Sequence, residues 1–99
     1  MTLTGKQKRY LRGLGHKLKS VVQIGKQGVT DAVLAQVESN LLAHELIKVK
    51  VLEGGPERDA CADAVCRATG AVVAQGLGRT LLLYRPHPEQ PRLQLPHAS

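Results

Sequence analysis

The hydrophobic residues of this chain follow two different spacings, and the order of those spacings predicts a mixed α/β fold. Apolar residues three and four positions apart, the spacing typical of helices, mark three segments: residues 4–15, 31–44 and 57–69. Short apolar runs rich in branched side chains mark four strands: residues 20–24, 46–51, 71–75 and 80–85. Strands separated by helices favour parallel pairing through right-handed crossovers, and the last two strands favour an antiparallel hairpin. We therefore expect α-β-α-β-α-β-β order and a four-stranded mixed sheet packed with helices.

The first predicted helix has an apolar side and a basic side. Thr4 is a suitable N-cap residue, and Gly15 favours termination. At about 100° per residue, Tyr10, Leu11 and Leu14 fall on one arc, which we expect to pack against the sheet. The opposite arc carries four basic residues: Lys6, Lys8, Arg9 and Arg12.

The other two predicted helices each have an apolar face that can cover the sheet. In the second, which begins after an N-cap at Thr30 or Asp31, this face consists of Val33, Leu34, Val37 and Leu41. In the third, helical spacing selects Cys61, Ala64, Val65 and Ala68, so that Cys61 is expected in the core. A tight turn over residues 76–79 joins the last two strands. The final 14 residues hold four of the five prolines, which predicts one domain over residues 1–86 and an irregular tail over residues 87–99.

Charge is distributed very unevenly along the chain. The first 28 residues contain seven Lys/Arg and no acid, whereas the rest contains seven basic and eight acidic residues. Such sorting favours a polyanionic partner, with nucleic acid the first candidate and an anionic membrane surface the second, although basic residues also serve solubility alone. The chain has two tyrosines and no phenylalanine or tryptophan, so it can hardly build an aromatic platform for stacking bases. A nucleic acid would therefore be held by its backbone and shape.

The loop Gly25-Lys26-Gln27-Gly28 is the sharpest candidate site. It follows a predicted strand and leads into a predicted helix, where free N–H groups and the positive end of the helix dipole favour an anion. Its glycines allow close approach of a phosphate, and Lys26 adds a charge at the tip. KH domains use a GxxG loop in this way. The alternative is an ordinary strand-to-helix turn, and a nucleotide-hydrolysing P-loop is excluded because no Lys-Ser/Thr follows the second glycine.

The basic arc of the first helix continues along the chain through Lys17 and Lys19, and we expect it to form one continuous patch with the loop. A solvated charged face is the alternative. His16 lies between the two basic groups and either contacts phosphate or sugar or caps the helix, and we favour the cap. We interpret His44 as structural and Lys48 and Lys50 as the solvated face of their strand.

No residue pattern indicates catalysis or a bound cofactor. Cys61 and Cys66 diverge by about 140° on a helix, which disfavours a shared metal ion, and they look too close in sequence for an ordinary disulfide. No Cys–His–acid group or paired carboxylate stands out, so we expect no enzyme, metal, cofactor or small-molecule substrate. The basic N-terminus lacks an apolar leader, and no run approaches the ~18–20 apolar residues that span a bilayer. We expect a cytoplasmic monomer.

Three blocks of the sequence resemble a known family. LTGKQKRYLRGLGHKLKSVVQIGKQGVTDAV, HELIKVKV and GRTLLLYRP occur in the order found in the CRM domain (chloroplast RNA splicing and ribosome maturation), especially its free-standing bacterial YhbY-like form. The resemblance covers residues 3–86. The chain departs from the usual pattern at Gly15, where members often carry alanine, and at Ser20, where they often carry proline.

This resemblance implies a fold related to the C-terminal domain of translation initiation factor three. It also implies RNA binding, in bacterial members to ribosomal RNA in precursors of the large ribosomal subunit. The implied contact residues are the four loop residues, the basic first helix, the His16–Lys19 segment, and the pair formed by Tyr84 and Arg85, of which we select Arg85.

Two other function classes stay open at this point. Charge directed at phosphates does not by itself distinguish RNA from duplex DNA, so a DNA-binding or architectural protein is one alternative. An adaptor that binds an acidic protein through the same helix is another. A membrane-surface helix is disfavoured because the apolar arc is short and lacks Trp and Phe.

Overall fold

The computed structural model describes residues 1–97 and confirms the predicted fold class and order of elements. The elements follow one another as α1 (Gly5–Gly15), β1 (Ser20–Ile24), α2 (Asp31–His44), β2 (Leu46–Val51), α3 (Pro56–Thr69), β3 (Val72–Leu77) and β4 (Thr80–Tyr84).

The four strands form one mixed sheet in the order β1-β2-β4-β3. β1 pairs with β2 in parallel, as expected for strands joined through a helix, and β4 is antiparallel to both β2 and β3. β4 lies between β2 and β3, so the crossover through α3 joins strands that are not neighbours. This central place suits β4 because its last four residues, 81–84, are all buried and can pack on both faces of the sheet.

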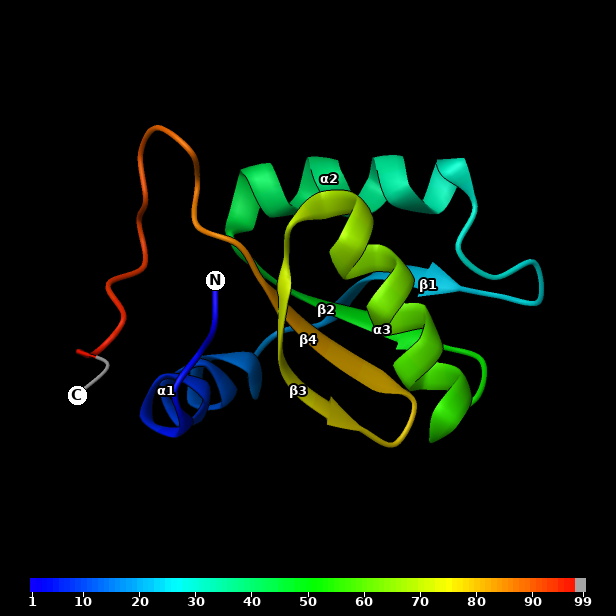
Figure 1. Ribbon diagram of the computed structural model, residues 1–99, viewed down its shortest axis with the longest axis horizontal. Coiled ribbons are helices and arrows are strands. Elements are labelled where there is room, and N and C mark those ends of the chain that lie inside the picture. Colours follow the sequence, from blue (N-terminus) through cyan, green and yellow to red (C-terminus); the bar gives the residue numbers. More distant parts are fainter. Residues whose placement is uncertain (98–99) are drawn as a thin grey trace.

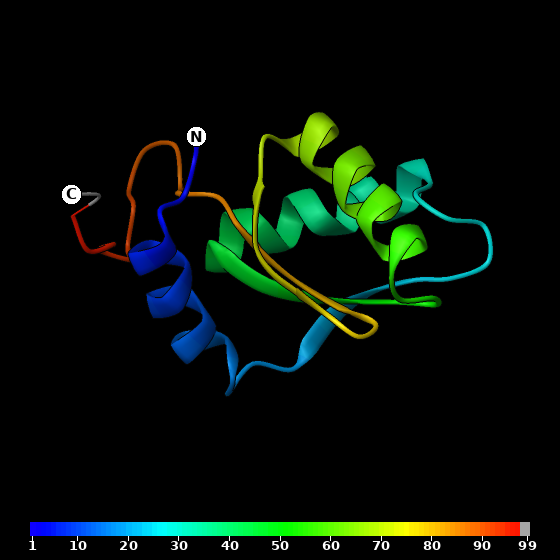
Figure 2. The same ribbon diagram turned by 60° about the horizontal axis from the view of Figure 1, so that its bottom comes forward.

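The helices cover the two faces of the sheet unequally (Figures 1 and 2). α2 and α3 lie together on one face, and the main core between them and the sheet includes Val37, Leu41, Val49, Val65 and Leu83. α1 lies at one end of the opposite face, over a smaller cluster that includes Leu3, Leu11, Leu46, Leu82 and Tyr84. The rest of that face has no helix over it, and we call it the open face.

α1 begins at the predicted cap but contacts the sheet along a narrower line than expected. The Thr4 hydroxyl accepts a hydrogen bond from the Gln7 N–H at 3.1 Å, and the Thr4 N–H donates to Gln7 Oε1 at 3.0 Å. Only Leu11 and Gly15 of the helix are buried, whereas Tyr10 and Leu14 are 39% and 37% exposed. Of the predicted apolar arc only Leu11 is therefore confirmed as an inner residue, because this helix covers only the end of the sheet and leaves the residues that flank Leu11 partly exposed.

Gly15 is the point of closest approach between α1 and the sheet. A Cβ atom at this position would lie 2.7 Å from Leu82 Cδ2 and 2.9 Å from Leu82 Cδ1. Carbon atoms in good contact are about 3.5–4.0 Å apart, so the leucine side chain occupies the space that a methyl group would need. The lack of a side chain at Gly15 thus lets α1 sit directly on β4.

The inner face of α2 is confirmed, whereas that of α3 is confirmed for Val65 and Cys61 but not for the two predicted alanines. In α2, Val37 and Leu41 are buried and pack with the half-buried Val33 and Leu34. In α3 the buried residues are Ala62 and Val65, with both cysteines half-buried beside them, whereas two predicted core residues are exposed: Ala64 and Ala68. The helix has alanine on several sides, which gives little contrast from which to select its inner face.

The hairpin between β3 and β4 is longer and tighter than predicted. β3 extends to Leu77, so Gly76 belongs to the strand and the turn consists of Gly78 and Arg79 alone. Gly78 has φ 57°, a conformation that two-residue hairpin turns commonly require and glycine adopts readily.

The segment after β4 contains no helix or strand within the described residues, and one buried carboxylate fastens it to the sheet. Glu45 Oε2 accepts the His87 N–H at 2.7 Å, and Oε1 accepts the N–H groups of Arg92 and Leu93 at 2.8 and 2.9 Å. Burial acts to raise the pKa of Glu45, but these N–H donors and the charge of Arg92 outweigh it and leave the pKa below its usual value. Glu45 also has φ 63°, a strained conformation for this residue type, at the junction of α2 and β2.

Candidate nucleic-acid interface

The Gly25–Gly28 loop forms a compact exposed turn between β1 and α2. The Gly28 N–H donates to the Gly25 carbonyl at 3.0 Å, and Lys26 and Gln27 stand at the exposed tip. Within the described part of the chain, neither the Lys26 nor the Gln27 N–H donates to a protein acceptor in a turn or to a side chain. The tip therefore presents backbone donors and one ammonium group to solvent, as an anion-binding turn would.

The two glycines of this loop have different structural requirements. Gly28 has φ 71°, so its backbone conformation favours glycine. Gly25 has no positive φ, and a Cβ atom there would meet no atom within 4 Å. The fold itself therefore does not require glycine at position 25. The open space beside it leaves the backbone accessible to a ligand.

The N-terminus of α2 is less free to bind an anion than the sequence suggested. The Thr30 side chain caps it by accepting the Val33 N–H at 3.2 Å, and Asp31 places a negative charge in the first turn. Both groups satisfy or offset the positive end of the helix dipole. An anion at this loop would thus depend on Lys26 and the tip N–H groups more than on the helix end.

The predicted basic residues of the N-terminal segment are all exposed. This group comprises Lys6, Lys8, Arg9, Arg12, Lys17, Lys19 and Lys26. Among residues 1–97 none of them takes part in an ion pair. His16 is the C-cap residue of α1, and its backbone N–H donates to the Arg12 carbonyl at 3.2 Å. Its exposed imidazole shares a shallow hollow with Arg12 on the open face, so capping by the backbone leaves the side chain available.

α1 and the Gly25–Gly28 loop lie at opposite ends of the molecule. The molecule measures 39 × 27 × 23 Å, and in both views α1 lies with the segment after β4 toward one end, whereas the loop projects at the other end (Figures 1 and 2). β1 separates them, because its extended backbone carries the chain away from α1. The expectation that the N-terminal segment alone forms one continuous patch was therefore wrong.

Two lysines that sequence reasoning set aside lie between these regions. Lys48 lines a hollow on the open face together with Arg12 and His16, and Lys50 lines another with Gly25 and Arg79.

The alternation of these two lysines along β2 was visible in the sequence, but alternation equally describes an ordinary solvated face. The structure adds that β1 and β2 are neighbours, with Ser20 opposite Lys48 and Gln23 opposite Lys50. This pairing places both lysines between α1 and the Gly25–Gly28 loop. We call Arg12, Lys19, Lys48, Lys50 and Lys26 the basic surface.

Arg85, the last predicted contact residue, is held inside the protein. Its guanidinium donates to Glu38 Oε1 and Oε2, both at 2.7 Å, and to the Thr69 carbonyl at 2.7 Å. The hydrogen bond from Arg85 lowers the pKa of Glu38, and the same bond raises the pKa of Arg85. The Arg85 side chain is 17% exposed and clamps α2 and α3 to the end of β4, away from the open face. We therefore do not include it in the basic surface.

Charge differs sharply between the two sides of the sheet. α1, β1 and β2 together contain six Lys/Arg and no acid, whereas α2 and α3 together contain five acids and two arginines. The three ion pairs of the described residues all involve α2 or α3: Arg58–Asp59, Arg67–Asp63 and Arg85–Glu38. The positive charges of α1 and β2 thus take part in no ion pair within the described residues, which favours a polyanion on this side.

Three further observations concern metal ions, membranes and thiols. Residues 1–97 contain no group of three or more His, Cys, Asp or Glu that could hold a metal ion. Within the same residues, each helix is too short or too polar to cross a bilayer. Cys61 and Cys66 are free thiols, and burial, followed by the charge of Asp63, raises the pKa of Cys66, which disfavours its reactive thiolate.

The chain is similar to known proteins over nearly its whole length. Residues 3–85 match the model of the CRS1/YhbY (CRM) domain. A Haemophilus influenzae protein named RNA-binding protein is 46% identical over 96 residues, which are 96% of each chain. The Bacillus subtilis protein YqeI, named a probable RNA-binding protein, is 40% identical over 95 residues, which are 95% of this chain and 99% of that one.

A solved structure has the same fold. The solution structure of Staphylococcus aureus SAV1595, described as a candidate RNA-binding protein, superposes with a TM-score of 0.83 at 38% sequence identity. The alignment covers 96% of this chain and 100% of the Staphylococcus aureus chain. The likeness in sequence and that in structure thus extend over nearly the whole molecule, and the chain belongs to the CRS1/YhbY (CRM) domain family.

Proposed function

We propose that this protein binds RNA through the basic surface and the Gly25–Gly28 loop. The observation that carries the proposal is the concentration of unpaired Lys and Arg on α1 and β2, where no acid occurs. The names of the Haemophilus and Bacillus relatives support RNA as the polyanion. In this arrangement Lys26 and the tip N–H groups hold phosphate at one end, Lys48 and Lys50 hold it in the middle, and α1 holds it at the other end.

The recognition we propose is directed mainly at the RNA backbone. Of the two tyrosines, Tyr84 is 2% exposed and Tyr10 is 39% exposed, so Tyr10 on α1 is the accessible one. One ring cannot form the stacking platform of an RRM or OB fold. If four or five phosphates are contacted, the plot of log affinity against log salt should have a slope of about −3 to −4.

We further propose that the bound RNA is ribosomal RNA in precursors of the large ribosomal subunit, and that the protein acts in the cytoplasm as a monomer without a cofactor. Family membership supports this assignment. We assign RNA binding to residues 1–86 and a supporting role to residues 87–99, several of which are anchored by Glu45.

Titration of a structured RNA with purified protein at several salt concentrations tests RNA binding. We expect Lys26→Glu to weaken binding without changing the circular dichroism spectrum or the melting temperature, because Lys26 is exposed and has no ion pair in the described chain. Arg67→Glu on α3, whose side chain is 80% exposed, is the matched control and should leave affinity nearly unchanged. Equal loss in both variants would contradict the assignment of the loop.

Two further measurements separate the finer proposals. Competition with duplex DNA at equal salt should favour structured RNA, and equal competition would support a DNA-binding protein instead. Sedimentation of a low-salt lysate should place the protein with large-subunit or pre-subunit particles, and both high salt and Lys26→Glu should release it. Confinement to the top fractions would contradict the ribosomal proposal and leave RNA binding itself standing. A particle association that survives nuclease treatment would indicate an acidic protein partner.

A further inference from the structure

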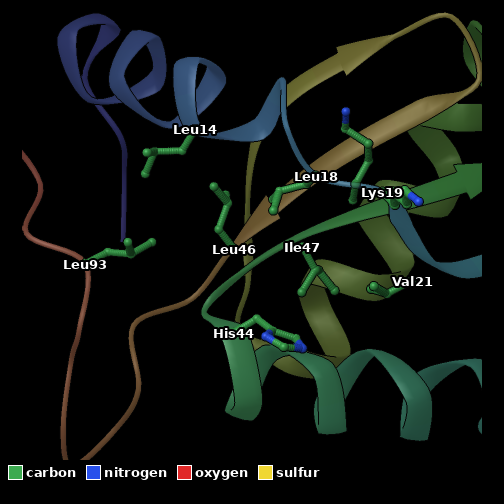
Figure 3. Close-up of a pocket in the computed structure, with 9 residues that line it drawn as sticks. Leu14, Leu18, Lys19, Val21, His44, Leu46, Ile47 and Leu93 are labelled. Carbon is green, nitrogen blue, oxygen red and sulfur yellow. The ribbon is translucent and has the colours of Figure 1, made fainter.

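An apolar hollow of about 410 Å³ lies beside the basic surface, at the edge of the sheet (Figure 3). Its walls come from four separate parts of the chain: Leu14 of α1, Leu18 and Val21 around the start of β1, Leu46 of β2, and Leu93 of the segment after β4. The volume falls within the ~300–1,000 Å³ that is typical of small-ligand sites.

Two of the apolar side chains that line this hollow are partly exposed to solvent. Val21 is 45% exposed and Leu14 is 37% exposed, although both are large apolar residues beside a well-packed cluster. Figure 3 shows these two side chains well apart, with Leu18 and Leu46 between them and Leu93 to one side. A ligand that fills the space would remove apolar surface from water, which is favourable.

Positive and hydrogen-bonding groups occupy the rim of the hollow. Lys19, Lys48 and His44 line it together with the apolar residues. Lys48 also lines the neighbouring hollow that contains Arg12 and His16, so the apolar hollow is continuous with the basic surface. A wholly apolar ligand would have no use for these cations, whereas a flat apolar group that carries phosphates would use both features.

The edge of the sheet adds backbone groups that can recognise such a ligand. β1 is an edge strand, and its pairing with β2 is irregular between Ser20 and Val22. Val21 lies at this irregularity and also lines the hollow. Edge strands and bulges leave backbone N–H and C=O groups without ladder partners, and these can bond to the edge of a base.

We propose that this hollow accepts one unpaired nucleobase of the bound RNA, while Lys19 and Lys48 hold the adjacent phosphates. This inference rests on the proposed RNA binding and adds that the substrate contains an unpaired nucleotide, such as a bulge. Apolar side chains can hold a base that has left its stack, so the scarcity of aromatic residues is no obstacle. His44 lies at the rim and can donate to or accept from the edge of the base.

Two RNA hairpins of equal length, one fully paired and one with a single bulged 2-aminopurine, test this inference. Binding and 2-aminopurine fluorescence are measured with the wild type and two neutral variants, Val21→Gln and Leu14→Gln. Both positions are partly exposed, so the fold should tolerate the change, and circular dichroism melting checks this. Leu42→Gln is the matched control, because Leu42 is 40% exposed on α2 and does not line the hollow.

We expect the wild type to bind the bulged hairpin about tenfold more tightly than the paired one, because the held base and the walls of the hollow lose apolar surface to water. Val21→Gln and Leu14→Gln should abolish this preference and the fluorescence change yet retain affinity for the paired hairpin. Leu42→Gln should behave as the wild type.

The outcomes separate this inference from the proposed function. Equal binding of both hairpins by the wild type, or a preference that survives in both hollow variants, would overturn the inference while RNA binding stands. Failure to bind either hairpin would overturn the proposed function as well. Self-association of the wild type that Val21→Gln abolishes would assign the hollow to a second copy of the chain and would also overturn the inference.

Discussion

On one face of the sheet, α2 and α3 bury Val49 and Leu83 completely; on the other, α1 buries Leu82 at one end and leaves Lys50 exposed. The covered face has most of the core and all of the ion pairs of the described residues. The open face has unpaired lysines and shallow hollows. The contrast indicates that the two faces have different roles. The covered face supplies most of the stability of the fold, whereas the lysines of the open face have no ion pair within the described residues and are available to a ligand.

The largest effect on stability should come from the covered face. Leu83 is fully buried in the middle of the main core, so Leu83→Ala should lower the free energy of unfolding by about 2–5 kcal/mol. Urea unfolding followed by circular dichroism measures this change. After correction for the fraction of the variant that is folded, its RNA affinity should equal that of the wild type. A direct loss of affinity would mean that the two faces are not independent.

A smaller effect should follow from loss of the carboxylate that joins the C-terminal segment to the sheet. Glu45→Ala leaves the three N–H groups that now bond to the carboxylate without their acceptor, so the free energy of unfolding should fall by about 2–3 kcal/mol. Hydrogen exchange at His87, Arg92 and Leu93 should accelerate. Unchanged exchange would show that other contacts hold this segment.

The same carboxylate predicts a pH dependence. Because the pKa of Glu45 is lowered in the folded protein, the folded state binds fewer protons than the unfolded state in the acid range. Its contribution is therefore complete above the ordinary glutamate pKa and fades as the pH falls through the lowered one. The difference in stability between the wild type and Glu45→Gln, measured by urea unfolding, should shrink as the pH is lowered over this window.

On the open face the expected effects are on binding alone. Replacing both Lys48 and Lys50 by glutamine removes two proposed phosphate contacts, so RNA affinity should fall by about tenfold and the salt slope should become less steep by about 2. Stability should stay nearly constant, since neither lysine has an ion pair within residues 1–97. Arg67→Gln is the control on the covered side. A slope that does not change would remove β2 from the RNA interface.

The smallest structural effect should occur at Gly25. Gly25→Ala adds a methyl group that meets no atom within 4 Å, so the free energy of unfolding should change by no more than about 0.5 kcal/mol. RNA affinity should nevertheless fall, because the methyl group blocks close approach of a phosphate to the loop. Gly28→Ala supplies the opposite pattern: its φ of 71° makes the substitution destabilising. If Gly25→Ala binds RNA as tightly as the wild type, a phosphate does not approach the loop closely at this glycine.

Local chemistry predicted the elements well. The cap at Thr4, the strand over residues 20–24 and the inner residues of α2 follow from spacing and turn chemistry, and all three are confirmed. The inner face of α3 could not be predicted in this way, because its exposed Ala64 and buried Ala62 are the same residue type. Likewise, Tyr10 and Leu14 look like core residues until the position of α1 at the end of the sheet is known.

The candidate site was less accessible to sequence reasoning because it depends on strand pairing. Lys48 approaches Arg12 and His16 only through the sheet, at a sequence separation that no local pattern bridges. The sequence around Glu45 does not indicate that this residue anchors the segment after β4, because its partners are backbone N–H groups more than 40 residues away. Arg85 is the reverse case: the resemblance predicts an RNA contact, and nothing in the sequence indicates that Glu38 and Thr69 hold its guanidinium.

The tight contact between Gly15 and Leu82 carries a consequence for the evolution of the family. An alanine at position 15 would place its methyl group 2.7 Å from the end of the Leu82 side chain, so either that side chain must turn aside or the residue opposite must change with it. Relatives with alanine at the position of Gly15 should carry a shorter side chain opposite it, or a leucine turned toward the neighbouring strand. An ancestral sequence reconstructed at these two sites would then reveal which of the two changed first, the helix or the strand beneath it.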